Sequence, residues 1–168
     1  MTLVPPPNTA GVIPPANPQH PLALGDIPNV NQIHADVNQL RGEMQLLQAG
    51  FARIEARQMN AGIARLNWLE MKSNTGLIEY RAKQKVVVGD GILLANALLV
   101  EGVAPLAALP VVPAVGTTIA ATISPDGLTH QAILDLIQFY NLDLGIQPNE
   151  ELVEIRWQRI LNWLTRDV

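Results

Sequence analysis

The sequence predicts an α+β fold in which one long helix precedes a small domain that ends in a pair of helices. Apolar residues recur at heptad spacing from Val30 onward. Two short β-prone runs flank a Gly-Asp-Gly triplet at 89–91, and two amphipathic helical segments follow residue 127. These observations divide the chain into a disordered Pro-rich tail (1–29), a coiled-coil helix (30–72) and a small α+β domain (73–168).

The composition limits the chemistry that this chain can carry. Its 168 residues are 48% hydrophobic and 15% charged, which is typical of a modest domain with a packed core and a tail. No cysteine is present, which excludes disulfides, cysteine-ligated zinc, iron–sulfur clusters and thiol nucleophiles. The first cationic residue is Arg41 and prolines interrupt the start, so we expect no secretory signal and predict an intracellular protein, cytoplasmic or nuclear.

The tail, residues 1–29, holds eight of the 13 prolines and a single charge, Asp26. Such a tract buries too little apolar surface to offset the entropy lost on ordering it. It therefore predicts a disordered and partly polyproline II segment.

A heptad seam runs through the helix that starts at Val30. Valine at the first two a positions and Leu or Ile at d favour a parallel two-stranded coiled coil, while Phe51 at a leaves a trimer open. Asp36 at g and Arg41 at the following e would pair across a parallel interface. The pattern weakens after Ile54, and the alternative is an amphipathic helix folded back on its own domain. The residues expected to drive self-association are Val30, Ile33, Val37, Leu40, Met44, Leu47, Phe51 and Ile54.

Basic residues concentrate between 41 and 85, where eight stand against four acidic ones. The densest part is YRAKQK, in which Arg81, Lys83 and Lys85 are the candidate nucleic-acid contacts and Tyr80 a candidate stacking group. A solvated helix face is the simpler interpretation of this charge.

The middle of the chain, residues 85–123, is aliphatic and broken by prolines. KVVVGDGILL predicts a β-hairpin around its Gly-Asp-Gly triplet, which lacks the Gly-Lys-Ser/Thr ending of a phosphate loop. Residues 92–123 contain one charge, Glu101, and membrane contact through them is a third hypothesis. Their prolines favour extended chain that covers the core.

Two helices are expected at the C-terminal end. Thr129 is a plausible N-cap for the first, which carries the stripe Ile133, Leu136, Ile137 and Tyr140. Asn149 is expected to cap the second, with Glu150 and Glu151 in its first turn. Phe139 and Trp163 lie off the two apolar stripes, so they are candidates for a partner surface, with burial against the β segments as the alternative. The stripe of the second helix is Val153, Trp157, Ile160, Leu161 and Leu164.

No catalytic, cofactor-binding or metal-ligating constellation is expected. The three histidines, His20, His34 and His130, are scattered, and none has a partner at metal-ligand spacing. The acidic cluster at 150–154 is better explained by helix capping and solvation than by catalysis. We therefore predict a non-enzymatic protein that binds copies of itself, as a dimer or trimer, and an unknown protein partner.

Two resemblances add to this reading. The strings L..LI.FYNL and R...IL..L, about 40 residues in all, resemble the helix-extended-helix arrangement of SAP-type modules, which implies docking to nucleic acid or protein. The order of Pro-rich tail, heptad helix, RLNW, short β segments, LTHQAILDLIQFYNL and EIRWQRILNWL is similar to fungal proteins that carry the C-terminal domain of a meiotically up-regulated gene product. That similarity covers residues 30–168 and implies a small α+β domain behind a coiled coil, with no established activity.

Overall fold

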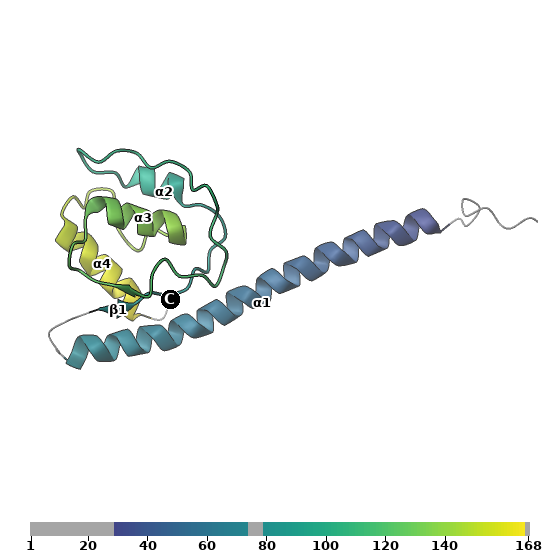
Figure 1. Cartoon of the computed structure of the whole chain (residues 1–168), viewed down its shortest axis with the longest axis horizontal. Coiled ribbons are helices and arrows are strands. Elements are labelled where there is room, and N and C mark those ends of the chain that lie inside the picture. Colours follow the sequence, from purple (N-terminus) through teal and green to yellow (C-terminus); the bar gives the residue numbers. More distant parts are fainter. Residues whose placement is uncertain (1–28, 74–78, 167–168) are drawn as a thin grey trace, which may run out of the picture. The chain divides into compact units, whose positions relative to one another are not determined.

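A computed structural model describes residues 29–73 and 79–166 of the chain (Figure 1). It confirms the coarse class, because a small antiparallel strand pair accompanies a mainly helical chain. The predicted disordered tail lies outside the described residues except for Asn29. In chain order the elements are α1 (Val30–Ser73), β1 (Tyr80–Arg81), α2 (Ile92–Ala97), β2 (Thr122–Ile123), α3 (His130–Tyr140) and α4 (Val153–Thr165).

The chain divides into two compact units, Met1–Gly42 and Glu43–Val168. The described part of the first unit is the beginning of α1, where every residue from 31 to 42 is exposed. The second unit contains the rest of α1 and all other elements. Helix α1 is thus part of the C-terminal unit over its longer portion.

In the second unit α1 docks through a narrow face of small and amide side chains. Ala56, Asn60, Ala64 and Asn67 are buried, and their spacing of three or four residues places them on one side of the helix. The Asn60 side chain donates to the carbonyl of Gln84 at 2.8 Å and accepts from its amide at 2.6 Å. Asn67 makes the same pair of hydrogen bonds with Arg81. The two asparagines therefore bind the extended segment at 81–84 much as a neighbouring strand would.

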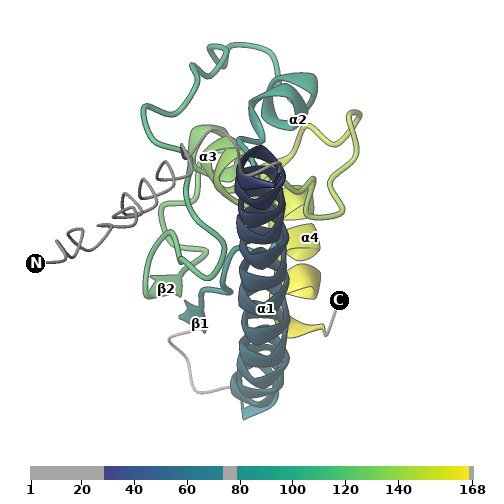
Figure 2. The ribbon, with the colours of Figure 1, turned by 90° about the vertical axis from the view of Figure 1, so that its right-hand side faces the viewer.

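The opposite edge of this extended segment pairs with β2 and the residues before it. Tyr80 lies opposite Ile123 and Arg81 opposite Thr122 in antiparallel register. Backbone hydrogen bonds from Ala82 to Ala121 and between Lys85 and residues 116–117 continue the pairing. Residues 80–85 thus lie between α1 and the chain around β2. Figure 2 shows β1 beside α1, with β2 farther from the helix.

The predicted β-hairpin at 85–94 is wrong, because its second half begins α2. Asp90 accepts from the amide of Ile92 through Oδ1 and from the amide of Leu109 through Oδ2. Gly91 packs its backbone directly on α3, where a Cβ would lie 2.5 Å from the carbonyl oxygen of Ile137. These contacts with distant segments favour a helix start over a hairpin turn at this triplet.

The core lies among α2, α3, α4 and the strand pair. Thr129 caps α3 as predicted, accepting from the amide of Ala132 at 3.2 Å, and Asn141 ends the helix in the left-handed conformation. Most of residues 101–122 are exposed, so the expected cover of the core is limited to partly buried side chains such as Val103 and Leu106. The buried apolar residues of this core are Tyr80, Ala82, Ala95, Leu98, Ile123, Ile133, Leu134, Leu136, Ile137, Tyr140, Leu144, Ile146, Ile160 and Leu164.

The second C-terminal helix begins later than predicted, because Leu152 and not Asn149 is its N-cap residue. Residues 147–150 form a turn closed by Glu150, whose carboxylate accepts from the amide of Gln147 at 3.0 Å. The fully buried Arg156 donates to the carbonyls of Glu150 and Leu98. This arginine fixes the turn to the end of α2, so Glu150 belongs to the turn and not to the helix.

Candidate interaction sites

The most prominent surface feature of α1 is a row of exposed apolar side chains, here called the α1 stripe. Seven of the eight predicted seam residues are exposed, including Leu47 at 62% and Phe51 at 64%, while Val30 is half-buried. The domain docks on a different face of the helix, through Ala56 and Asn60. The stripe consists of Ile33, Val37, Leu40, Met44, Leu47, Phe51 and Ile54.

Exposed apolar residues continue along α1 beyond the predicted seam. Met59, Leu66 and Leu69 are 40–55% exposed, although Gln58 and Arg65 occupy the expected a positions. These three residues are seven and then three positions apart, a helical spacing that can be recognised in the sequence. A strict heptad register missed it, because the apolar row drifts by about one position along a straight helix.

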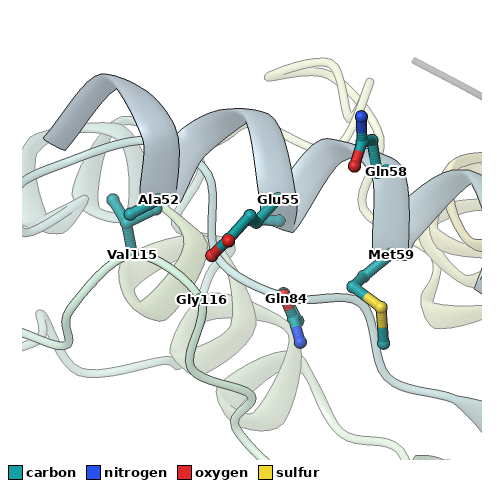
Figure 3. A pocket seen from close by; sticks show the side chains of 8 residues that line it. Ala52, Glu55, Gln58, Met59, Gln84, Val115 and Gly116 are labelled. Carbon is teal, nitrogen blue, oxygen red and sulfur yellow. The ribbon is translucent and has the colours of Figure 1, made fainter. Parts of the chain in front are cut away.

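A cavity of about 530 Å³ lies along one flank of α1 (Figure 3). Helix α1 contributes Ala52, Glu55, Ala56, Gln58 and Met59, and the facing wall comes from Gln84, Val115 and Gly116. Glu55 is the charged residue among these lining residues, so we call this the acidic cavity.

A groove of about 560 Å³, here called the basic groove, involves the opposite flank of α1 and helix α4. Four of its lining residues are cationic and one, Asp143, is anionic. Arg159 is held by Glu150, with 2.6 Å between Nη2 and Oε1, and this hydrogen bond lowers the pKa of the carboxyl. The lining residues are Arg57, Asn60, Lys83, Gln84, Val86, Val87, Leu142, Asp143, Leu144, Gly145, Arg159, Asn162, Trp163 and Arg166.

Trp163 and Phe139, the predicted partner surface, both contact Tyr140. The ring centroids are 4.8 Å apart for Trp163 and Tyr140 and 4.9 Å apart for Phe139 and Tyr140, with edge-on geometry. Both outer rings are half-buried against the core, and Trp163 also lines the basic groove. Burial therefore accounts for much of each ring, and Trp163 keeps a face toward the groove.

The predicted nucleic-acid contacts at Lys83 and Lys85 need correction, because both lysines are buried. The Lys83 ammonium donates to the carbonyl of Arg166 and lies over the Trp163 ring, and Lys85 donates to the carbonyl of Phe139. Burial lowers the pKa of Lys85, and the nearby Asp90 carboxylate opposes this shift. Arg81 is exposed and pairs with Glu70 at 3.8 Å. Lys83 and Lys85 therefore make hydrogen bonds within the fold and are not accessible to the phosphates of a nucleic acid.

Metal-ligand clusters and membrane-spanning helices are absent among the residues that the structure describes. Among them no group of three or more His, Cys, Asp or Glu side chains is placed to hold a metal ion. Within 29–73 and 79–166, no helix is long and apolar enough to cross a bilayer.

Comparison of the chain with family models, curated proteins and solved structures finds no match. The resemblances to the fungal proteins and to SAP-type modules therefore stay predictions.

Proposed function

We propose that this chain is a non-enzymatic assembly protein that associates with copies of itself through the α1 stripe and binds a protein partner with its C-terminal domain. The observation that carries the proposal is the stripe, seven apolar side chains at heptad spacing that all lie exposed on one helix. Exposed apolar rows of this length are typical of interaction surfaces. Pairing two stripes removes apolar area from water, which contributes about 25 cal/mol per Å² buried.

Self-association is tested by placing charges within the stripe. We expect the double variant Leu40→Asp/Leu47→Asp to sediment as a monomer at concentrations where the unmodified chain is oligomeric, because two carboxylates in each helix would be buried at the seam. The matched control is Leu93→Asp, which introduces the same charge at a leucine that is 83% exposed outside the stripe. Equal sedimentation of the double variant and the unmodified chain would refute a role for the stripe.

The basic groove is the surface on the domain that we propose for the protein partner. Its cations and the Trp163 face suit a segment in which a carboxylate stands beside an apolar side chain. A labelled Glu-rich peptide should bind with salt-sensitive affinity, measured by fluorescence anisotropy, and Arg166→Glu should abolish binding. Retained affinity in Arg166→Glu would remove the groove from the proposal.

Nucleic-acid binding is the alternative function, and it now depends on Arg57, Arg159 and Arg166 instead of the buried lysines. A labelled duplex in the same anisotropy assay separates the two alternatives. Tighter binding to duplex than to the acidic peptide would favour the nucleic-acid function. Membrane contact through residues 92–123 is the third alternative, and co-flotation with liposomes tests it.

A further inference from the structure

We propose that two copies of α1 pair in antiparallel orientation, centred at residue 49, next to Gly50. This inference rests on the proposed self-association and specifies its geometry. Three features support the orientation: the order of apolar and polar residues along the seam, the charges on the two flanks of α1, and the position of Gly50.

The order of residues along the seam favours the antiparallel pair. In an antiparallel coil centred here, Met44 faces Ile54 of the second copy and Leu47 faces Phe51 of the second copy. Farther out, Ile33 faces Arg65 of the second copy. The aliphatic part of the Arg65 side chain can then cover the apolar surface of Ile33. A parallel pair would instead place Arg65 beside Arg65 of the second copy, which brings like charges together.

The flank at the acidic cavity carries the second argument. Glu55 lies at heptad position e and lines this cavity (Figure 3). Side chains at e face e of the second copy in an antiparallel coil, and this register brings Arg41 of the second copy toward Glu55. Both residues are exposed, so they are accessible for an intermolecular ion pair. The acidic cavity thus has room and charge for a guanidinium from the second copy.

The opposite flank has the complementary charge. Arg57 lies at position g and lines the basic groove. Because g faces g in this orientation, Glu43 of the second copy approaches Arg57. Each of these two pairs occurs twice in a symmetric dimer. A parallel coil would keep the Asp36–Arg41 pair but would place Glu55 opposite Gly50 and Arg57 opposite Gly62 of the second copy.

Gly50 lies one residue along α1 from the proposed twofold axis. It lies at position g, faces Gly50 of the second copy, and has no atom within 4 Å of the Cβ position it lacks. The absence of a side chain on both helices permits close approach at the centre of the dimer.

Cysteine cross-linking tests the orientation, because the chain contains no cysteine of its own. In the proposed register, residue 44 of each copy is ten residues along the axis from residue 44 of the second copy, about 15 Å at the rise of an α-helix. That separation is beyond the Cα distance of a disulfide, about 4.4–6.8 Å. We expect Met44→Cys and Ile54→Cys chains to remain uncross-linked when each is oxidised alone, and to form a disulfide-linked heterodimer when they are refolded together.

The outcomes separate the orientation from the proposed function. Cross-linking of Met44→Cys with itself would overturn the antiparallel arrangement and leave self-association intact. A trimeric mass would also overturn the dimer geometry, whereas a monomer would overturn the orientation and the proposed function together.

A charge exchange tests the flank contacts independently. Arg41→Glu should raise the dimer dissociation constant by roughly fivefold, because it faces Glu55 of the second copy. Adding Glu55→Arg to the same chain should restore the constant to near its original value. Absence of rescue would overturn the contact at the acidic cavity, because only the antiparallel pair brings these two positions together.

Discussion

Asn67 shows how single side chains hold the second unit together. From a fully buried position in α1 it donates to the carbonyls of Arg81 and Leu164 and accepts from the amide of Arg81. Asn67→Ala leaves these backbone groups without partners, at about 1–3 kcal/mol for each unsatisfied group. We expect the free energy of unfolding in urea to fall by about 2–4 kcal/mol. The exposed Asn38→Ala is the control, and an equal effect of both changes would contradict this role.

Gly91 and Gly42 are predicted to respond in opposite directions to the same substitution. In Gly91→Ala the new methyl group would lie 2.5 Å from the Ile137 oxygen and 2.8 Å from Asn141 Cα, so we expect a loss of about 2 kcal/mol or more. Gly42 is helical and has open space around it, so Gly42→Ala should stabilise by about 1 kcal/mol. Thermal unfolding at matched protein concentration checks both. A tolerated Gly91→Ala would contradict the backbone contact between this turn and α3.

The ionisation of Glu150 should make the free energy of unfolding depend on pH. The hydrogen bond from Arg159 is the largest cause that lowers the pKa of this carboxyl from its ordinary 4.5. A lowered folded-state pKa means that the stabilisation is complete above 4.5 and is lost as the pH falls through the lower folded value. Denaturant titrations of the unmodified chain and Glu150→Gln should therefore differ most at neutral pH and converge in acid. A difference that is constant with pH would exclude this linkage.

The buried cations mark the limit of sequence reasoning at the residue scale. Lys and Arg side chains are mostly exposed in proteins, yet Lys83, Lys85 and Arg156 are all buried. These side chains donate hydrogen bonds to the carbonyls of Arg166, Phe139 and Leu98. Each acceptor is more than 50 residues away from its donor in the sequence. Only the tertiary fold brings these acceptors close, so local charge density could not reveal them.

At the scale of elements, the docking face of α1 depends on small side chains. Ala56 is fully buried where the helix meets the extended segment and lines the acidic cavity. Ala56→Leu should push α1 away from this segment and destabilise the chain by about 1–3 kcal/mol. Ala49→Leu, at an exposed position outside the seam, should have little effect. Urea unfolding of the two variants compares them directly, and equal midpoints would mean that α1 does not dock through this face.

The elements differ in how far local sequence determined them. Helix α3 was predictable, because its cap at Thr129 and its apolar face are both local signals. Helix α2 was not, since a β-prone valine run at 86–88 precedes it and its start depends on Asp90 and Gly91 contacting Leu109 and α3. The start of α4 was misplaced because Glu150, a typical first-turn residue, is used by Gln147 and Arg159 instead.

At the scale of the whole molecule, the heptad seam was the strongest prediction from the sequence. Seven of its eight residues are exposed on α1, and the self-association expected of them stays a proposal. The sequence could not show that the same helix also docks on the domain, because the docking face consists of Ala and Asn residues without an apolar period. One helix therefore has two faces, of which only the apolar one was visible as a pattern.

Light scattering coupled to size-exclusion chromatography on the full chain tests the central claim most directly. The chain mass is 18.2 kDa, and pairing along the α1 stripe predicts twice this mass at tens of micromolar, decreasing on dilution. Pairing through the stripe in either orientation predicts that Leu40→Asp/Leu47→Asp returns the mass to that of one chain. A mass of 18.2 kDa for the unmodified chain across this concentration range would contradict the assembly function.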